Sequence, residues 1–251
     1  MTKAEIQLVR ALADKRGRAE HGLFVAEGEK LIGELRTSHL RVRKIFTLEG
    51  VFEGPGVETV APRDMGRLSL LKTAGNSLAL VEIPRYELNT ETLKGRLTLA
   101  LDDVQNPGNL GTIIRLADWF GITDILCSPG TADCFNPKVV QATMGAVIRV
   151  RVHYTELAPQ LAAAAAQGIP VYGTFLEGEN IYGAELTPEG IVVMGNEGRG
   201  VTEPVARTVT RKLFIPPWPA DRRGSESLNV AMATGIICSE FRRRIAPPVL
   251  P

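Results

Sequence analysis

The stretch Leu97-Thr-Leu-Ala-Leu-Asp-Asp-Val-Gln-Asn-Pro-Gly-Asn-Leu-Gly-Thr-Ile-Ile-Arg115 joins an apolar segment to an amphipathic one. Its first five residues are apolar enough for a buried strand, and two carboxylates follow them. Pro107 fixes its own φ and Gly108 allows a positive φ, so a tight turn is expected, with Asn109 placed to cap the next helix. The stretch therefore predicts a strand, a turn and a helix, the repeating unit of α/β proteins.

Two faces are expected on the helix that follows the turn. The apolar face holds Leu110, Ile113, Ile114, Ala117 and Phe120. The other face holds Gly111, Arg115 and Asp118, and Gly111 would leave a gap through which a ligand could approach the backbone. An ordinary surface ion pair between Arg115 and Asp118 explains the same positions equally well.

The composition is that of a globular protein with no bulk charge. The chain has 251 residues, 44% of them hydrophobic and 23% charged, and its net charge is +1. Basic residues cluster at Lys15, Arg16 and Arg18 and again at Arg242–Arg244. Solvated helix ends can explain both clusters, and this explanation is favoured for the second, which lies where a helix dipole prefers cations. Overall charge alone does not indicate a nucleic-acid-binding protein.

The cysteine and hydropathy patterns point to a reducing compartment. Cys127, Cys134 and Cys238 lack metal-ligand spacing, and their odd number fits no disulfide framework, so neither a metal site nor disulfides are expected. No apolar run reaches membrane-spanning length, and the N-terminus lacks the apolar core of a signal peptide. A cytoplasmic location without membrane association is expected.

The order of predicted elements divides the chain into two α/β parts. Residues 1–84 are expected to form a small N-terminal domain, 85–96 a polar linker, 97–245 a larger domain and 246–251 a tail. In the larger domain strands are predicted at 97–102, 123–127, 149–153, 169–175, 191–195 and 212–215, and helices at 109–120, 137–145, 155–167, 202–208 and 227–243. Such alternation predicts a mostly parallel sheet covered by helices on both faces, with ligands near the carboxyl ends of its strands.

Two further stretches carry functional signals. Ile191–Gly200 runs from an apolar strand into a loop with three glycines, Asn196 and Glu197, and glycines let backbone groups approach a ligand closely. It is not a phosphate-binding Walker loop, and the chain has no dinucleotide-binding glycine motif. The other stretch, Leu213–Ile236, contains an apolar strand, two prolines and a helix for which Ser227 is a good N-cap candidate. Asn229 in that helix is expected to need polar partners.

Together, Asn106-Pro-Gly-Asn-x-Gly-x-x-x-Arg115, Gly195-Asn-Glu-Gly-x-Gly200 and Ile215-Pro…Ser227-Leu-Asn-Val resemble the three motifs of the SpoU (TrmH-like) RNA 2′-O-ribose methyltransferases of the SPOUT superfamily. Phe24-Val-Ala-Glu-Gly-Glu-Lys30 resembles the L30e-like substrate-binding domain that often precedes them.

This resemblance implies a SPOUT domain with a deep trefoil knot, bound S-adenosylmethionine and a homodimer with the active site near the subunit interface. The residues matched to cofactor binding are Thr174, Phe175, Gly195, Ile215 and Leu228, and those matched to the polar active site are Asn109, Arg115, Glu197, Ser227 and Asn229. The expected substrate is RNA, with 23S rRNA favoured over tRNA.

The resemblance makes Arg115 the proposed base, but a guanidinium is not expected to release its proton. We expect Arg115 instead to hold an RNA phosphate and the developing alkoxide. Structural and direct roles are equally open for Glu197, whereas turn formation is favoured over acid–base chemistry for Asp102 and Asp103. The competing functions are a non-catalytic RNA-binding or ribosome-assembly protein that retains the fold, and methylation of a base rather than a ribose.

Overall fold

The computed structural model describes residues 1–219 and 227–245, which form two compact units. Unit 1 comprises Met1–Arg85 and the later segment Asp133–Arg149, and unit 2 comprises Tyr86–Ala132 and the chain from Val150 onward. The predicted tail at 246–251 lies outside the described residues, and so do Ser225 and Glu226 of the stretch Leu213–Ile236.

Unit 1 is an α/β domain built on a four-stranded sheet. Its strands are β1 (Leu23–Glu27), β2 (Val42–Thr47), β3 (Val57–Thr59) and β4 (Ser77–Glu82), in the order β1-β4-β2-β3. β4 is antiparallel to both of its neighbours, and β2 and β3 are parallel. Its helices are α1 (Lys3–Ala11), α2 (Lys15–His21), α3 (Glu29–Arg36), α4 (Pro62–Leu68) and α6 (Pro137–Thr143), and a 3₁₀ turn η2 covers Ala146–Ile148.

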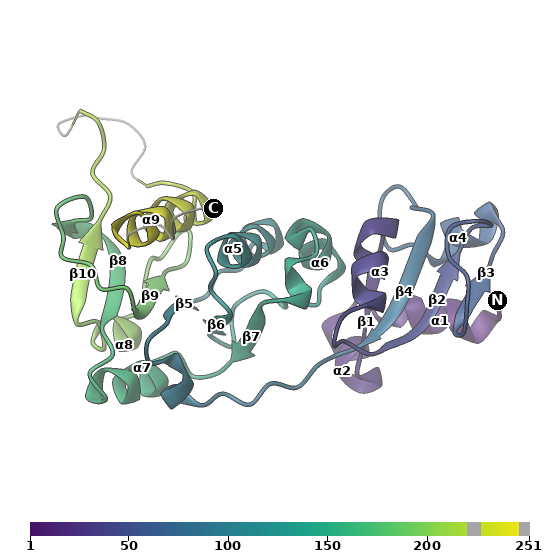
Figure 1. Cartoon of the computed structure of the whole chain (residues 1–251), viewed down its shortest axis with the longest axis horizontal. Coiled ribbons are helices and arrows are strands. Elements are labelled where there is room, and N and C mark those ends of the chain that lie inside the picture. Colours follow the sequence, from purple (N-terminus) through teal and green to yellow (C-terminus); the bar gives the residue numbers. More distant parts are fainter. Residues whose placement is uncertain (220–226, 246–251) are drawn as a thin grey trace, which may run out of the picture. The chain divides into compact units, whose positions relative to one another are not determined.

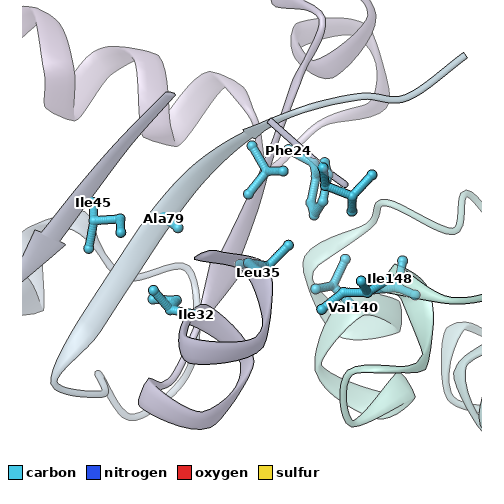
Figure 2. Packing of buried hydrophobic residues seen from close by; sticks show 11 residues of the cluster. Phe24, Ile32, Leu35, Ile45, Ala79, Val140 and Ile148 are labelled. Atoms are coloured by element: carbon cyan, nitrogen blue, oxygen red, sulfur yellow. The ribbon is translucent and has the colours of Figure 1, made fainter. Parts of the chain in front are cut away.

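Segment Asp133–Arg149 contributes to the core of unit 1. Figure 2 shows Val140 and Ile148 from this segment opposite Phe24 and Leu35, in one cluster of buried side chains. The Phe24 and Phe135 rings also lie 4.7 Å apart between centroids. Part of the chain that sequence periodicity assigned to the larger domain therefore completes the apolar core of the smaller one.

Arg18 corrects one expectation from the sequence. The sequence prediction has no helix at α2, and it treats Arg18 as part of a solvated cluster. Arg18 is instead 2% exposed and pairs with Asp133, its Nη2 lying 2.6 Å from Asp133 Oδ2. Its Nη1 donates to the carbonyls of Leu12 and Ala13, each at 2.8 Å, so all three guanidinium nitrogens of this buried side chain have a partner.

Unit 2 is a six-stranded parallel sheet. Its strands are β5 (Leu97–Leu101), β6 (Asp124–Cys127), β7 (Arg151–Tyr154), β8 (Val171–Asn180), β9 (Gly190–Met194) and β10 (Arg211–Phe214). The strand order is β10-β8-β9-β5-β6-β7, and every neighbouring pair is parallel. The predicted parallel α/β domain is confirmed, and the predicted strands differ mainly at their ends. The trefoil knot stays a prediction.

Helices cover both faces of the sheet in unit 2. They are α5 (Pro107–Trp119), α7 (Leu157–Ala166), α8 (Glu203–Ala206) and α9 (Val230–Arg244), with a 3₁₀ turn η1 at Thr90–Leu93. Figure 1 shows α5 and α9 together on one side of the sheet and α7 and α8 on the other. Leu93 of η1 is buried in the core against α7, so part of the predicted linker packs as structure of unit 2.

The arginines at the end of α9 bind main-chain carbonyls. Arg242 Nε donates to Phe120 O at 2.7 Å, and Arg244 Nη2 donates to Tyr182 O at 2.8 Å. Arg243 and Arg244 also pair with Glu240, which is 6% exposed. The expectation of a solvated helix end is wrong for Arg242 and Arg244, which attach α9 to neighbouring segments, whereas Arg243 is exposed and pairs with Glu240 of its own helix.

Candidate active site

The residues matched to cofactor binding lie at the carboxyl ends of adjacent strands. Thr174 is in β8 just beyond its pairing with β9, Gly195 directly follows β9, and Ile215 directly follows β10. The Thr174 hydroxyl donates to Val193 O of β9 at 2.9 Å. Since β10, β8 and β9 are neighbours in the sheet, the parallel topology brings these positions to one edge.

Phe175 lies in a part of β8 that leaves the ladder. The pairing between β10 and β8 jumps from Lys212–Gly173 to Leu213–Glu179, so the intervening residues form a bulge. A Cβ at Gly173 would lie 2.5 Å from the Phe175 ring, and the Lys212 ammonium lies 5.0 Å from the centroid of that ring. A larger residue at position 173 would therefore displace the Phe175 ring.

Asn106, not Asn109, caps α5. The Asn106 side-chain oxygen accepts from the backbone N–H groups of Gly108 at 2.8 Å and Asn109 at 3.2 Å. Pro107 occupies the first helical position, which leaves the preceding residue extended and outside the helix. The Asn109 side chain is consequently available for other contacts, and its Nδ2 donates to Glu197 Oε1 at 2.8 Å.

The N-cap of α9 is Asn229, and the prediction of Ser227 is wrong. Asn229 Oδ1 accepts from the backbone N–H groups of Ala231 at 3.0 Å and Met232 at 3.3 Å. Its Nδ2 then donates to Asn109 Oδ1 at 3.0 Å. The predicted need of Asn229 for polar partners is met by two backbone amides and one side chain.

The backbone of α9 fixes the direction of a three-residue hydrogen-bond chain, Asn229 to Asn109 to Glu197. Because backbone N–H groups can only donate, Asn229 must point Oδ1 at the helix and Nδ2 at Asn109. Asn109 must then accept with Oδ1 and donate with Nδ2, so Glu197 is the terminal acceptor. The orientations of both side-chain amides therefore follow from the partners that can only donate or only accept.

The same contact joins the beginnings of two long helices. Asn109 lies in the first turn of α5, which has 13 residues, and Asn229 caps α9, which has 15. At the other end, Arg242 of α9 reaches the Phe120 carbonyl that follows α5, so the two helices run parallel. Two helix N-termini meeting at one point create a positive potential that favours a phosphate or a developing oxyanion.

Arg115 and Ser227 are not joined to this chain. Both side chains are exposed, and neither makes a hydrogen bond or ion pair within the part of the chain that the structure describes. Gly111 is buried on the side of α5 that faces the protein, so the expected open gap beside Arg115 is absent. Leu228 is 52% exposed beside Asn229.

Asp102 and Asp103, for which turn formation was favoured, bind loops of the same edge. Asp102 Oδ2 accepts from Thr202 N at 2.6 Å, and the Asp103 carbonyl accepts from Asn196 Nδ2 at 2.7 Å. The contact of Asn196 with the first motif was not predicted from the sequence. The feature that could have indicated it is an amide side chain in a glycine-rich loop at the end of a strand.

The described residues contain no metal-binding group and no exposed thiol. Among residues 1–219 and 227–245 there is no group of three His, Cys, Asp or Glu side chains placed to hold a metal ion. The three cysteines are buried thiols, and burial raises the pKa of Cys238 to about 12. Within the same residues, no helix is long and apolar enough to cross a membrane.

Comparison with protein-family models decides the family. The model of the SpoU rRNA Methylase family matches residues 96–239, and the model of the MRM3-like substrate binding domain matches residues 3–79. The chain belongs to the SpoU rRNA methylase family. The match includes Asn109, Glu197 and Asn229, which the structure joins, and a segment that matches a substrate binding domain precedes it.

Individual relatives agree with this family. A Bacillus subtilis protein named 23S rRNA (guanosine(2553)-2′-O)-methyltransferase RlmP is 30% identical over 238 residues, which cover 92% of this chain and 93% of the relative. A Xanthomonas campestris protein named 23S rRNA (guanosine-2′-O-)-methyltransferase RlmB is 35% identical over 161 residues, and the match covers 61% of each protein.

Solved structures show the same architecture. A Porphyromonas gingivalis protein assigned to the TrmH family of RNA methyltransferases superimposes with a TM-score of 0.87 at 40% identity, covering 97% of this chain and 99% of that one. An AdoMet-bound rRNA methyltransferase from Sinorhizobium meliloti superimposes with a TM-score of 0.85 at 29% identity, covering 98% and 96%.

Proposed function

We propose that this chain transfers a methyl group from S-adenosylmethionine to a ribose 2′-hydroxyl of RNA, with 23S rRNA favoured over tRNA. The observation that carries the proposal is the Asn229–Asn109–Glu197 chain at two converging helix N-termini. It provides oriented donors and an acceptor where a hydroxyl has to lose its proton. Relatives named as 23S rRNA 2′-O-methyltransferases support the substrate class.

The edge formed by β10, β8 and β9 fits S-adenosylmethionine. Gly195 packs so closely on its own turn that a Cβ would lie 2.4 Å from the Gly200 carbonyl carbon, which makes this a loop of bare backbone. Thr174, Phe175, Ile215 and Leu228 complete the set proposed to hold the cofactor. When bound, the cofactor supplies an already activated methyl group, so the protein has to align the ribose oxygen and withdraw its proton.

We assign Arg115 to charge stabilisation. An arginine side chain stays protonated in proteins, and its planar fork binds phosphate with two parallel hydrogen bonds. Arg115 is exposed on α5 and uncommitted to any other described side chain, so RNA can reach it. We propose that it holds an RNA phosphate and the developing alkoxide, and that this phosphate takes the 2′-hydroxyl proton and passes it to solvent. Asn109, Ser227 and Asn229 orient the ribose, and Glu197 accepts the hydrogen bond from Asn109.

The deciding experiment combines methyl transfer with analysis of the modified nucleoside. Purified protein, labelled S-adenosylmethionine and 23S rRNA should give a 2′-O-methylated nucleoside in mass spectrometry after nuclease digestion. Arg115→Lys keeps the charge but loses the fork, and we expect it to lower kcat by ~10²-fold or more. Turnover close to that of the unmodified protein would remove Arg115 from the chemistry.

The same experiment separates the competing functions. A methylated base in place of a methylated ribose would support base methylation. Failure to bind S-adenosylmethionine in calorimetry would favour a non-catalytic RNA-binding or ribosome-assembly protein. The RNA target is best identified by mapping the 2′-O-methyl sites that disappear from the total RNA of a deletion strain.

We also propose that the chain works as a homodimer. The supporting observation is that α5 and α9, which pack together, each carry a large apolar side chain in solvent: Trp119 is 82% exposed and Met232 is 63% exposed. Sedimentation equilibrium of the intact protein should give twice the chain mass, and Trp119→Glu should shift it toward the monomer. A monomer at all concentrations would refute the dimer.

A further inference from the structure

The turn that carries Glu197 is a rigid unit in itself. Asn196 and Gly200 exchange both backbone hydrogen bonds, each at 2.9 Å. Asn196 Oδ1 also accepts from the backbone N–H groups of Gly198 at 2.9 Å and Arg199 at 3.0 Å. These bonds fix the internal shape of the turn, so the position of Glu197 depends on how the whole turn is attached to the sheet.

Two consecutive aspartates attach this turn to the end of β5. Asp102, which is 3% exposed, accepts with its carboxylate from Thr202 N at 2.6 Å on the far side of the turn. Asp103 accepts with its main-chain carbonyl from Asn196 Nδ2 at 2.7 Å on the near side. Because β5 also leads into the first turn of α5, these two attachments set the position of Glu197 relative to Asn109.

Asp103 adopts a strained conformation that aims its carbonyl at Asn196. Its φ is 58°, in the left-handed region that residues other than glycine rarely adopt. Ser128 Oγ holds it in place, since it accepts from Asp103 N at 2.8 Å and donates to Asp103 Oδ1 at 2.7 Å. Gly130 makes room for the carboxylate, because a Cβ there would lie 2.3 Å from Asp103 Oδ1.

A fourth contact closes the arrangement. Arg199 Nη2 lies 3.2 Å from Asp103 Oδ2, so the turn reaches back to the side chain of the same residue whose carbonyl holds Asn196. Asp103 therefore contacts the loops that follow β6 and β9 as well as its own. Strain of this kind persists only where the surroundings impose it, and it is concentrated at functional sites.

We propose that Asp103 and Asn196 are positioning residues for methyl transfer: the bond between the Asp103 carbonyl and the Asn196 amide fixes where Glu197 meets Asn109. This inference rests on the proposed function only for its effect on turnover. Its structural part, that this bond immobilises the turn, stands separately. Both residues act through Glu197 and need no contact with the ribose.

Asn196→Asp isolates this bond. The carboxylate can still accept from Gly198 N and Arg199 N, so the turn itself is retained, but it has no N–H to donate to Asp103. Asn196→Ala lacks both the donor and the acceptor and adds no charge, so comparing it with Asn196→Asp separates loss of the bond from a new negative charge near Glu197. We expect both variants to lower kcat by about 10-fold or more, because small misplacements of catalytic groups are costly.

Asp124→Asn is the matched control. Asp124 lies at the amino end of β6 in the same sheet, where its carboxylate also pairs with an arginine and a hydroxyl, from Arg151 and Thr123. It should lose stability without changing kcat at neutral pH. If the Asn196 variants lose no more turnover than Asp124→Asn, the positioning role is refuted.

Two further measurements distinguish positioning from general destabilisation. In a double-mutant cycle, adding Asn196→Asp to Glu197→Ala should lower kcat by no more than about 2-fold, since a missing carboxylate cannot be misplaced. Multiplicative losses would contradict a shared pathway. Amide hydrogen exchange, measured without substrate, should become faster at 196–202 in Asn196→Asp and stay unchanged in Asp124→Asn.

The exchange experiment also separates this inference from the proposed function. A loosened turn in a protein that methylates no RNA would refute the methyltransferase proposal and leave the attachment of the turn intact. Unchanged exchange at 196–202 would refute the attachment, whatever the activity of the wild-type protein.

Discussion

Asn229→Asp separates the two contacts of one side chain. Asn229 caps α9 with its oxygen and supports Asn109 with its nitrogen. Aspartate is as good an N-cap as asparagine and carries a negative charge, which is favourable at a helix N-terminus. The cap should survive the substitution, so the free energy of unfolding should fall only by the value of the lost bond to Asn109, about 0.5–1.5 kcal/mol.

The hydrogen-bond chain, in contrast, cannot survive it. A carboxylate at this position would face Asn109 Oδ1, and flipping the Asn109 amide would only move the clash to Glu197, because two acceptors would then meet there. One hydrogen bond is lost in either orientation, which is worth about 0.5–1.5 kcal/mol before any added repulsion between carboxylates. Since 1.36 kcal/mol corresponds to a factor of ten in rate, we expect the lost bond alone to lower kcat about 2- to 13-fold, and repulsion between the carboxylates to lower it further.

The assay is single-turnover methyl transfer beside urea unfolding, with Asn229→Ala as the comparison. The alanine variant loses the cap and the chain together, so it should lose about 1 kcal/mol more stability than Asn229→Asp, as well as activity. Wild-type turnover in Asn229→Asp would show that the chain has no part in the reaction. A stability loss equal to that of Asn229→Ala would show that Asn229 does not act as the cap.

Three other predictions follow from contacts elsewhere. Arg18→Met should lower the free energy of unfolding by about 3 kcal/mol because it leaves the partly buried carboxylate of Asp133 without its partner. Arg207→Met, which breaks an exposed ion pair, should change the free energy of unfolding by less than about 0.5 kcal/mol in the same urea titration. Gly195→Ala should abolish S-adenosylmethionine binding in calorimetry because its Cβ has no room, whereas Gly33→Ala, with open space around it, should bind normally. Burial alone would raise the pKa of Asp124, but hydrogen bonds from its histidine and arginine partners hold this pKa well below the usual range, so its stabilisation is complete above about pH 5 and is lost as the pH falls. Asp124→Asn should therefore flatten the acid side of the stability curve, and an unchanged slope would contradict this assignment.

The local sequence predicted elements well and the roles of individual polar side chains less well. Hydrophobic periodicity was sufficient for the parallel sheet, because each buried strand is apolar along its own length. Both cap predictions chose the wrong member of a polar pair: Asn109 instead of Asn106, and Ser227 instead of Asn229. The first could have been avoided, since a proline at the first helical position leaves the residue before it as the cap.

Contacts between distant segments lay beyond sequence reasoning. Arg18 in a run of basic residues looks solvated until the fold places Asp133 beside it, 115 positions later. The Asp103–Asn196 bond spans 93 positions and depends on a left-handed residue that only the surrounding loops impose. Family motifs identify which residues belong to the site, but periodicity and spacing carry no information about such partners.

The two caps together explain how the site can form at all. If Asn109 capped α5, its side-chain oxygen would be occupied by the backbone of its own helix and could not accept from Asn229. Capping by Asn106 releases Asn109, and capping by Asn229 determines which end of the released amide faces Glu197. The polarity of the chain is therefore set by backbone N–H groups of α9, which cannot reverse. In the proposed reaction, polar groups held in this way need not reorganise, which is the condition under which electrostatic stabilisation is most effective.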